Sequence, residues 1–416
     1  TAGLTADDLL NRAHLRGFLK LTLDADRTAV EEALKGDLAV VQYDGDLAEV
    51  FTGLQIPGVL DDLYAAAART DQLGVTFTDG APSLKLWAPT AKDVGLLLYA
   101  DATGTGEPTR VDMTRSAAGV WSVTGEAGWV NRAYQFDVEV FVPALDAVTS
   151  NVVTDPYSVG LTLNSTHSVL VDLDDPQWAP EIWTGNEAPV IDQFADRTIY
   201  ELHIRDFSIS DETVPAELRG TYEAFALEGT DGVEALTELA DAGMNTVHLL
   251  PSFDIATIEE DRSEQVHPVI PDAGPASEEQ QAAVTAVADQ DAFNWGYDPY
   301  HYSTPEGSYA SDENQEGGKR TSAFREMVGG LHGMGLQVVL DKVYNHTAQS
   351  GQAEKSVLDK VVPGYYHRLS LTGTVEKSTC CENVATEHEM AEQLMVDSVV
   401  TWARDYHVDG FRFDLM

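Results

Sequence analysis

Four short apolar segments after residue 195 alternate with segments of helical periodicity, and this alternation limits the possible folds most. The predicted strands are residues 198–204, 246–251, 336–340 and 408–413. Apolar side chains recur at helical spacing within residues 232–242, 327–334 and 391–406. The 246–251 segment is a nearly continuous apolar run, which is typical of a strand buried on both faces. This order predicts a parallel sheet, and we expect the first half of a (β/α)₈ barrel over residues 195–416.

The upstream part of the chain has a different pattern. Residues 1–72 predict a small module that contains a hairpin, 38–51, around an Asp-Gly turn and a helix at 61–69. Residues 73–180 predict a β-sandwich, because short strands are separated by turn residues roughly every 8–12 positions. The predicted sandwich strands are residues 75–77, 84–87, 94–99, 120–123 and 134–138.

Two segments are expected to lie outside these domains. Residues 180–189 are largely polar with a proline at each end, which predicts a linker. Residues 254–292 are rich in Glu, Gln and Ala and predict an insertion after the second strand of the barrel. The acidic runs 259–261 and 278–279 are expected to be solvated surface.

Charge and cysteine content exclude several classes of partner. The 416 residues include 25 basic and 69 acidic side chains, a net charge of −44. This surface repels nucleic acid and anionic lipid, so we expect neither as a partner, and it is typical of an extracellular or cell-surface protein. No apolar run reaches the length of about 18 residues that a membrane span needs, and no signal peptide is recognisable. Cys380 and Cys381 are neighbours, so two free thiols without a metal are expected.

Polar side chains follow the predicted barrel strands, where such barrels carry their chemistry. Arg412 and Asp414 are two residues apart, so both point to the same face of their strand. A guanidinium beside a carboxylate keeps it ionised, as a carboxylate nucleophile requires. Residues 293–300 contain four aromatic residues together with Asn and Asp. Such a loop suits a sugar, whose C–H faces stack while its hydroxyls need hydrogen-bond partners.

These motifs resemble those of one enzyme family. Residues 341–346 and 410–414 resemble two short sequence regions of the α-amylase family, glycoside hydrolase family 13. Residues 294–299, Asn-Trp-Gly-Tyr-Asp-Pro, resemble the signature of its pullulanases, and 200–208 resemble the family's first strand. The segment 380–390 is similar to type I pullulanases and limit dextrinases. Residues 86–91 and 154–158 resemble a family 48 carbohydrate-binding module, and 56–64 resemble the segment before it.

The resemblance implies a role for each matching residue. Asp414 corresponds to the catalytic nucleophile, Arg412 to the arginine that keeps it ionised, and Asp341 to the carboxylate that pairs with that arginine. Asn345 corresponds to a calcium ligand, and no organic cofactor is implied. The implied substrate contacts are His346, which bonds the sugar before the scissile bond, Tyr297, which stacks on it, and Trp295, Asp298 and Asn294 around that ring.

The resemblance also implies an activity, retaining cleavage of α-1,6-glucosidic bonds in pullulan, amylopectin or limit dextrins. The family's general acid is a Glu after the fifth strand, and this Glu has no counterpart here. We therefore expect this chain to supply the nucleophile but not the general acid. A second polypeptide is expected to carry the remaining barrel. The alternatives are an inert α-glucan-binding fragment and a related isoamylase or neopullulanase activity.

Five residues are expected to be structural. His203 and His248 alternate with apolar residues in predicted buried strands, and Trp87 and Trp121 belong to the predicted sandwich core. Lys342 replaces a residue that is usually apolar in the family, and it should point away from the sugar.

Overall fold

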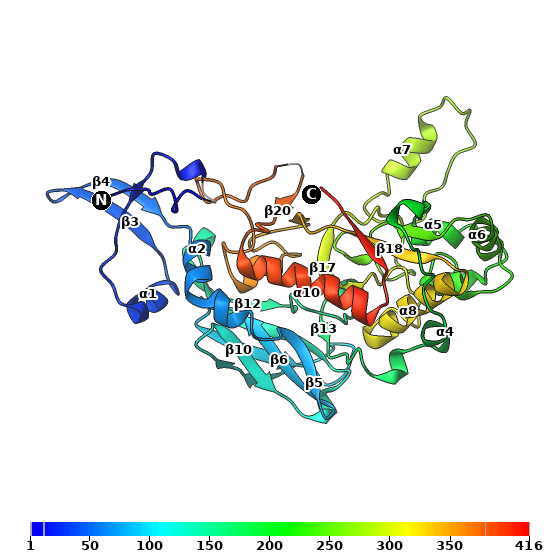
Figure 1. Ribbon diagram of the computed structural model, residues 1–416, viewed down its shortest axis with the longest axis horizontal. Coiled ribbons are helices and arrows are strands. Elements are labelled where there is room, and N and C mark those ends of the chain that lie inside the picture. The colour runs from blue at the N-terminus through cyan, green and yellow to red at the C-terminus, as the bar shows by residue number, and fades with distance from the viewer. Residues whose placement is uncertain (1, 11–12, 379, 416) are drawn as a thin grey trace.

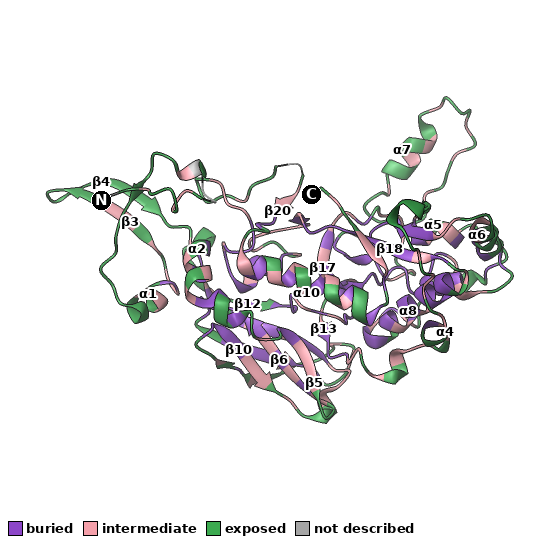
Figure 2. Ribbon diagram, in the orientation of Figure 1, coloured by how far each residue is buried: buried purple, intermediate pink, exposed green. Residues whose placement is uncertain are grey.

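The computed structural model describes residues 2–10, 13–378 and 380–415. Figure 1 shows a long molecule with an N-terminal hairpin at one end, a β-sandwich in the lower middle, and strands covered by helices at the other end. Buried residues concentrate in the last two regions, whereas the hairpin is largely exposed (Figure 2). Among the described residues, no helix is long and apolar enough to cross a bilayer.

The N-terminal region contains the predicted hairpin and helix. The hairpin turns at Gly45, whose φ of 60° suits glycine. The predicted helix over 61–69 is confirmed as a helical run in which Leu60, Tyr64 and Ala68 are buried. The elements are β1 (Ala2–Gly3), β2 (Leu19–Lys20), α1 (Arg27–Ala33), β3 (Ala39–Asp44), β4 (Leu47–Gly53), α2 (Pro57–Leu60), the π-helical turn η2 (Asp61–Ala65) and α3 (Ala66–Ala68).

The β-sandwich consists of two antiparallel sheets, with strand orders β5-β6-β10-β9 and β12-β11-β7-β8. Alternating side chains of β6, β7 and β11 are buried between them, as expected for a sandwich. All five predicted strands are confirmed, and Trp87 and Trp121 are buried as predicted. The strands are β5 (Gly74–Thr78), β6 (Ala81–Trp87), β7 (Asp93–Leu98), β8 (Thr109–Asp112), β9 (Thr114–Arg115), β10 (Val120–Thr124), β11 (Ala133–Val142), β12 (Ala147–Val153) and β13 (Ser168–Val169), which pairs with β11.

A four-stranded parallel sheet follows, in the order β14-β15-β18-β21. All four predicted strands are present, but the first one ends at Leu202 because His203 caps the next helix. The elements are β14 (Ile199–Leu202), α5 (Ile204–Ser208), α6 (Asp231–Asp241), β15 (Thr246–Leu249), α8 (Gly317–Gly333), β18 (Gln337–Lys342), α10 (Glu389–Asp405) and β21 (Gly410–Phe413). Smaller elements are β16 (Phe253–Ile255), β17 (Pro299–Pro305), β19 (His346–Thr347), α9 (Leu358–Val361) and β20 (Glu382–Asn383).

The predicted linker at 180–189 is wrong, because this segment is packed against the helices. It contains the helix α4 (Glu181–Gly185), whose Trp183 is buried. The guanidinium of Arg325 lies 4.4 Å from the Trp183 ring, and the His407 ring stacks on it at 4.0 Å. The two prolines therefore bound a segment whose short helix is anchored by one buried tryptophan.

The predicted insertion at 254–292 begins later than expected. Asp254 lies in β16, which pairs with β17, and both Asp254 and Glu260 are buried. The prediction that residues 259–261 are solvated surface is therefore wrong for Glu260, although Glu278 and Glu279 are exposed as predicted. The part that projects from the molecule carries α7 (Glu279–Thr285), as Figure 1 shows.

A buried ionic cluster surrounds Arg320, a fully buried residue of α8. Its Nη2 lies 2.8 Å from Glu260 Oε2, and its Nη1 lies 3.6 Å from Asp254 Oδ1. Carboxylate oxygens of Asp254, Glu260 and Glu306 lie within 4.8 Å of one another, and all three side chains are buried. One guanidinium therefore faces three carboxylates without access to water.

The same cluster joins the parallel-sheet region to the sandwich. Ser165, in the loop before β13, donates a hydrogen bond to Asp254. The backbone N–H of Asn164 donates to Glu260 Oε2, and the Asn164 side-chain oxygen accepts from the backbone N–H of Glu260 at 2.8 Å. The two regions are thus connected through buried charged groups.

This burial makes stability depend on pH. Burial raises the pKa of Glu260 to about 7 and that of Glu306 to about 8, from ordinary values of 4.5. Between the ordinary pKa of 4.5 and the raised pKa of each group, the folded state binds more protons than the unfolded state. Each group therefore lowers the free energy of unfolding as pH rises, by up to about 1.4 kcal/mol per pH unit.

Glu260→Gln isolates this contribution. Glutamine keeps an oxygen for Arg320 and Asn164, and its NH₂ replaces Oε1, which has no hydrogen-bond partner. We expect the stability of the variant relative to the original protein to increase between about pH 5 and pH 7, measured by denaturant unfolding. Glu228→Gln, at an exposed position, should give a difference independent of pH. A Glu260→Gln difference that is also independent of pH would contradict the prediction.

Candidate functional site

Asp341, Arg412 and Asp414 meet at the carboxyl ends of β18 and β21. Asp341 stands opposite Arg412 in the register of the two strands. Nη1 of Arg412 lies 2.9 Å from both carboxylate oxygens of Asp341 and 2.9 Å from Oδ1 of Asp414. The backbone N–H of Asp414 donates to the carbonyl oxygen of Lys342 at 3.0 Å. The structure therefore brings the three residues predicted to be catalytic together, with the arginine between two carboxylates.

The two carboxylates differ in burial. The Asp341 side chain is 1% exposed, compared with 16% for Asp414 and 46% for Arg412. Burial raises the pKa of Asp341, and hydrogen bonds from Arg412 and Tyr297 act in the opposite direction. The hydrogen bond to Asp341 raises the pKa of Arg412 above its usual value, so the guanidinium stays charged. Asp414 is thus the more accessible carboxylate, and it has a permanent positive charge beside it.

The aromatic loop before β17 reaches the same place. The Tyr297 hydroxyl donates to Asp341 Oδ2 at 2.8 Å, and burial raises the pKa of Tyr297 above its usual value, so the phenol remains a donor. Trp295 is 60% exposed, with Phe293 packed edge-to-face at 5.7 Å. Tyr297 is therefore fixed against the charged residues, whereas Trp295 is free to contact a ligand.

Asn294 and Asp298 hold this loop in place. The Asn294 side-chain nitrogen lies 2.9 Å from Thr257 Oγ1, and the Thr257 hydroxyl donates to Asp298. Gly296 has a φ of 84°, and a Cβ there would lie 2.8 Å from the Pro251 carbonyl oxygen, so only glycine fits. The structure places both residues near Tyr297, as predicted, in a role that stabilises the loop.

His346 and Asn345 are engaged with protein groups. His346 is buried, its Nδ1 lies 2.6 Å from Asn345 Oδ1, and its Nε2 lies 2.8 Å from the Tyr297 carbonyl oxygen. The Asn345 side-chain nitrogen donates to the carbonyl oxygen of Asp414 at 2.8 Å. A sugar contact by His346 stays a prediction, and it would require one of these contacts to open. Because the Asn345 oxygen faces an imidazole nitrogen, this geometry does not fit a calcium ligand.

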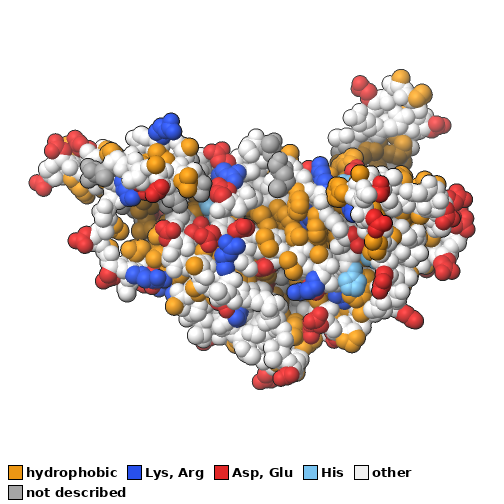
Figure 3. All heavy atoms as spheres, in the orientation of Figure 1, with side chains coloured by type: hydrophobic (Ala, Val, Ile, Leu, Met, Phe, Trp, Pro, Cys, Tyr) orange, Lys and Arg blue, Asp and Glu red, His pale blue; other side chains and the backbone are white. Residues whose placement is uncertain are grey.

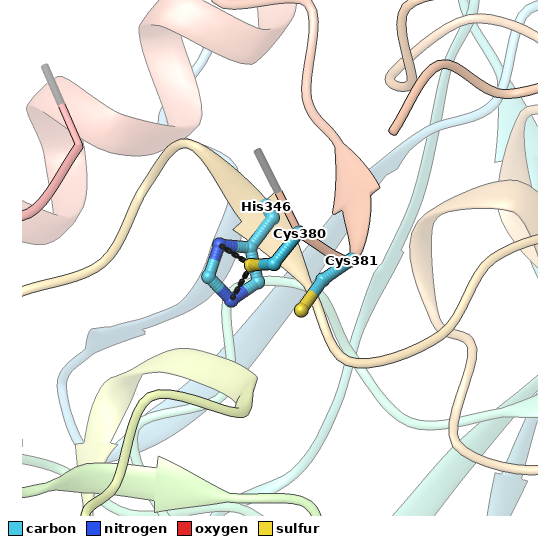
Figure 4. Close-up of side chains that lie close together, drawn as sticks. All are labelled: His346, Cys380 and Cys381. Carbon is cyan, nitrogen blue, oxygen red and sulfur yellow. Dashed lines mark hydrogen bonds between the residues drawn. The ribbon is translucent and has the colours of Figure 1, made fainter. Parts of the chain in front are cut away.

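The two cysteines lie beside His346, which the sequence spacing gave no reason to expect. Cys380 and Cys381 are free thiols, as predicted. Their sulfur atoms and a His346 nitrogen lie within 4.8 Å of one another, and Cys380 Sγ faces the imidazole ring in Figure 4, 3.8 Å from Nδ1. Desolvation and the neighbouring Cys380 raise the pKa of Cys381 to about 12, which disfavours the thiolate that binds metals.

The two histidines that were predicted to lie in buried strands have different surroundings. His203 is buried against Phe293, and its Nε2 lies 2.8 Å from the Asn294 carbonyl oxygen, which supports the predicted structural role. His248 lies between two carboxylates, those of Glu201 and Asp341. Sequence reasoning missed this contact, although a histidine within an otherwise apolar strand was a signal for it.

Lys342 is fully buried on the opposite face of β18 from Asp341. Its Nζ donates to the Tyr302 carbonyl oxygen at 2.8 Å and lies 4.5 Å from the Phe253 ring centroid and 4.6 Å from that of Trp402. Burial lowers the pKa of Lys342 well below its usual value. The aromatic rings and a single carbonyl replace the water that an ammonium normally has.

Lys342→Met should therefore change stability in a pH-dependent way. In the unfolded chain the lysine binds a proton up to its ordinary pKa of 10.5, whereas the folded state disfavours that proton. The lysine thus contributes stability that increases with pH, by up to about 1.4 kcal/mol per pH unit. We expect the variant to be more stable than the original protein at about pH 6, with a smaller advantage at about pH 9. Unfolding by denaturant tests this, with the exposed Lys92→Met as control, and an advantage that grows with pH would refute it.

Comparison with known proteins gives matches along the whole chain. Residues 1–62 match the family model of the pullulanase N2 domain, and residues 72–158 match that of carbohydrate-binding module 48, the isoamylase N-terminal domain. The chain is 40% identical to pullulanase 1, chloroplastic, of Arabidopsis thaliana over all of its residues and 43% of that protein. It is 39% identical to a pullulanase of Klebsiella pneumoniae over 97% of this chain and 41% of that protein.

The same relationship holds for solved structures. The crystal structure of Klebsiella pneumoniae pullulanase complexed with maltotriose superimposes on the whole chain with a TM-score of 0.93 and 37% identity, over 43% of that protein. The ligand-free structure gives a TM-score of 0.93. The chain thus spans less than half the length of these relatives. The resemblance predicted from the motifs is confirmed.

Proposed function

The chain is homologous to pullulanases along its whole length, and from this premise we propose that it forms part of a retaining glycoside hydrolase that cleaves α-1,6-glucosidic branch linkages. The proposed substrates are pullulan, amylopectin or limit dextrins. The observation that carries this proposal is the bridge made by Arg412 between buried Asp341 and accessible Asp414 at the ends of two parallel strands. The acidic surface supports an extracellular or cell-surface location as a further proposal.

We propose that Asp414 is the nucleophile and that its neighbours orient it. Arg412 supplies a fixed positive charge, which favours the carboxylate that attacks the anomeric carbon. Tyr297, held by Asp341, presents an aromatic ring on which a sugar can stack, so that the ring is oriented before attack. His346, Trp295, Asn294 and Asp298 surround this position. No step in this scheme depends on calcium or on an organic cofactor.

The general acid comes from elsewhere in this proposal. Retaining hydrolysis uses two carboxyl groups about 5–5.5 Å apart, one of which protonates the leaving oxygen. Asp341 is the second carboxylate near Arg412, but its oxygens accept hydrogen bonds from Arg412 and Tyr297 and it is buried. Asp341 is therefore a positioning residue, and we expect a Glu from a further part of the barrel to serve as the acid.

We also propose that the four-stranded parallel sheet is half of a (β/α)₈ barrel over residues 195–416. The strand order and parallel pairing support this, as does the exposure of Ile199 and Tyr200 on one edge strand and of Phe413 on the other. Hydrophobic side chains also gather in the middle of the face seen in Figure 3, where α10 exposes Val396 and Val400. Further strands and helices would cover these surfaces.

The alternative is binding of α-glucan without cleavage, which the match of residues 72–158 to a carbohydrate-binding module supports. Release of reducing sugar from pullulan separates the two functions, because a binding protein would release none. Comparison of maltotriose release from pullulan with hydrolysis of α-1,4-linked amylose separates a pullulanase from isoamylase or neopullulanase activity.

Asp414→Asn tests the nucleophile. In the complete enzyme we expect this substitution to remove nearly all turnover of pullulan, by a factor of about 10⁴ or more, and to leave glucan binding unchanged. Glucan binding is measured by affinity electrophoresis in the same preparation. A variant that keeps more than about a few per cent of the rate would end the assignment.

The exposed edges test the barrel proposal. Open edge strands with apolar neighbours favour association, so we expect residues 195–416 to be stable only when further polypeptide covers β14 and β21. Size-exclusion chromatography with mass spectrometry of the purified protein should detect this polypeptide. A soluble, cooperatively folding monomer of 45.1 kDa with nothing bound would show that the half-barrel does not need completion.

A further inference from the structure

His248, on β15, lies between carboxylates from the two neighbouring strands. Its Nδ1 is 3.1 Å from Glu201 Oε2 on β14, and its Nε2 is 3.8 Å from Asp341 Oδ2 on β18. The side chain is 10% exposed, so water contributes little to its hydrogen bonding. The imidazole ring is thus the link between the edge of the sheet and the buried carboxylate of the proposed site.

The geometry determines which protons the ring needs. A neutral imidazole carries a proton on one nitrogen and a lone pair on the other. In this position the lone pair would face a carboxylate whichever nitrogen it occupied. Nε2 is buried and has no hydrogen-bond partner, so no other donor compensates for that repulsion. A ring with protons on both nitrogens avoids this repulsion at both carboxylates.

The charges then alternate across the sheet. Glu201 pairs with His248 in the register of β14 and β15, and Asp341 pairs with Arg412 in the register of β18 and β21. Arg412 in turn contacts Asp414 at 2.9 Å. Each of the four parallel strands thus contributes one charged residue to a row that leads to Asp414. Glu201 is negative, His248 is positive in its doubly protonated form, Asp341 is negative and Arg412 is positive.

We propose that His248 is a positioning residue whose imidazolium form, held by Glu201, orients Asp341 so that Asp341 and Arg412 together fix Asp414. This proposal rests on the proposed hydrolase function. The groups that face His248 are Glu201 from β14 and Asp341 from β18, and Asp341 is itself contacted by Arg412 from β21 and Tyr297 from the loop before β17. A neutral ring would place a lone pair against one of these carboxylates, so the proposed role belongs to the doubly protonated ring.

The protonation state can be measured without activity. In the assembled protein with ¹⁵N-labelled histidine, long-range ¹H–¹⁵N NMR should show protons on both nitrogens of His248 at about pH 7. Glu201→Gln keeps the side-chain shape but removes the charge that faces Nδ1, and its spectrum should show a single tautomer of His248 at the same pH. A His248 signal of a single neutral tautomer at about pH 6 would overturn the proposal.

The kinetic consequence distinguishes positioning from simple packing. We expect His248→Gln to lower kcat on pullulan by about 10- to 100-fold with little change in KM. We expect Glu201→Gln to lower kcat as well and to change its pH profile, which a packing role would not do. His332→Gln is the matched control, because His332 is a buried histidine paired with Asp409 at 2.9 Å on another part of the fold. It should leave both kcat and the pH profile unchanged.

The two proposals fail in different ways. Full turnover of pullulan by Asp414→Asn would contradict the hydrolase mechanism, whatever the NMR of His248 shows. An inactive Asp414→Asn variant combined with normal kcat and an unchanged pH profile in both His248→Gln and Glu201→Gln would retain the nucleophile and overturn the role of His248.

Discussion

The arrangement of the molecule depends on the buried guanidinium of Arg320. It is the positive charge that α8 places among Asp254, Glu260 and Glu306. These side chains come from β16, from the segment after β16 and from the residue that follows β17. Removing one partner of a buried ion pair leaves an uncompensated charge, which is costly in a medium without water. The cluster therefore fixes α8, β16 and β17 relative to one another, and through Asn164 and Ser165 it fixes the sandwich as well.

This junction also determines where the aromatic loop lies. His301, on β17, connects Asp254 at 2.6 Å to Thr154 of the sandwich at 2.7 Å. Tyr297 is two residues before β17, so the position of its hydroxyl against Asp341 follows from the position of that strand. The sandwich thus contributes to the proposed site through β17, although none of its own described side chains forms a hydrogen bond or ion pair with Asp341, Arg412 or Asp414.

Sequence periodicity predicted the local strands and helices. It did not predict the burial of a residue when that burial depends on a partner far away in the sequence. The strands and helices follow from alternating or helical patterns, and Arg412 and Asp414 follow from their spacing on one strand. Glu260 was expected at the surface because acidic residues flank it, but its partner Arg320 is 60 residues away. Trp183 lies between two prolines that suggested a linker, and its burial depends on Arg325 and His407. The contacts of His346 with Tyr297 and of His248 with Asp341 depend on neighbouring strands in the same way.

The burial of Asp341 explains how the proposed site divides its tasks. Its two oxygens receive Arg412 and Tyr297 and face His248, so this carboxylate organises three groups from three segments. A carboxylate with these contacts and almost no exposure is poorly placed to exchange a proton with a substrate. Asp414 shares the same arginine but has the more exposed side chain, and it can approach a sugar while the positive charge stays fixed. The buried carboxylate therefore sets the geometry, and the accessible one is available for the chemistry.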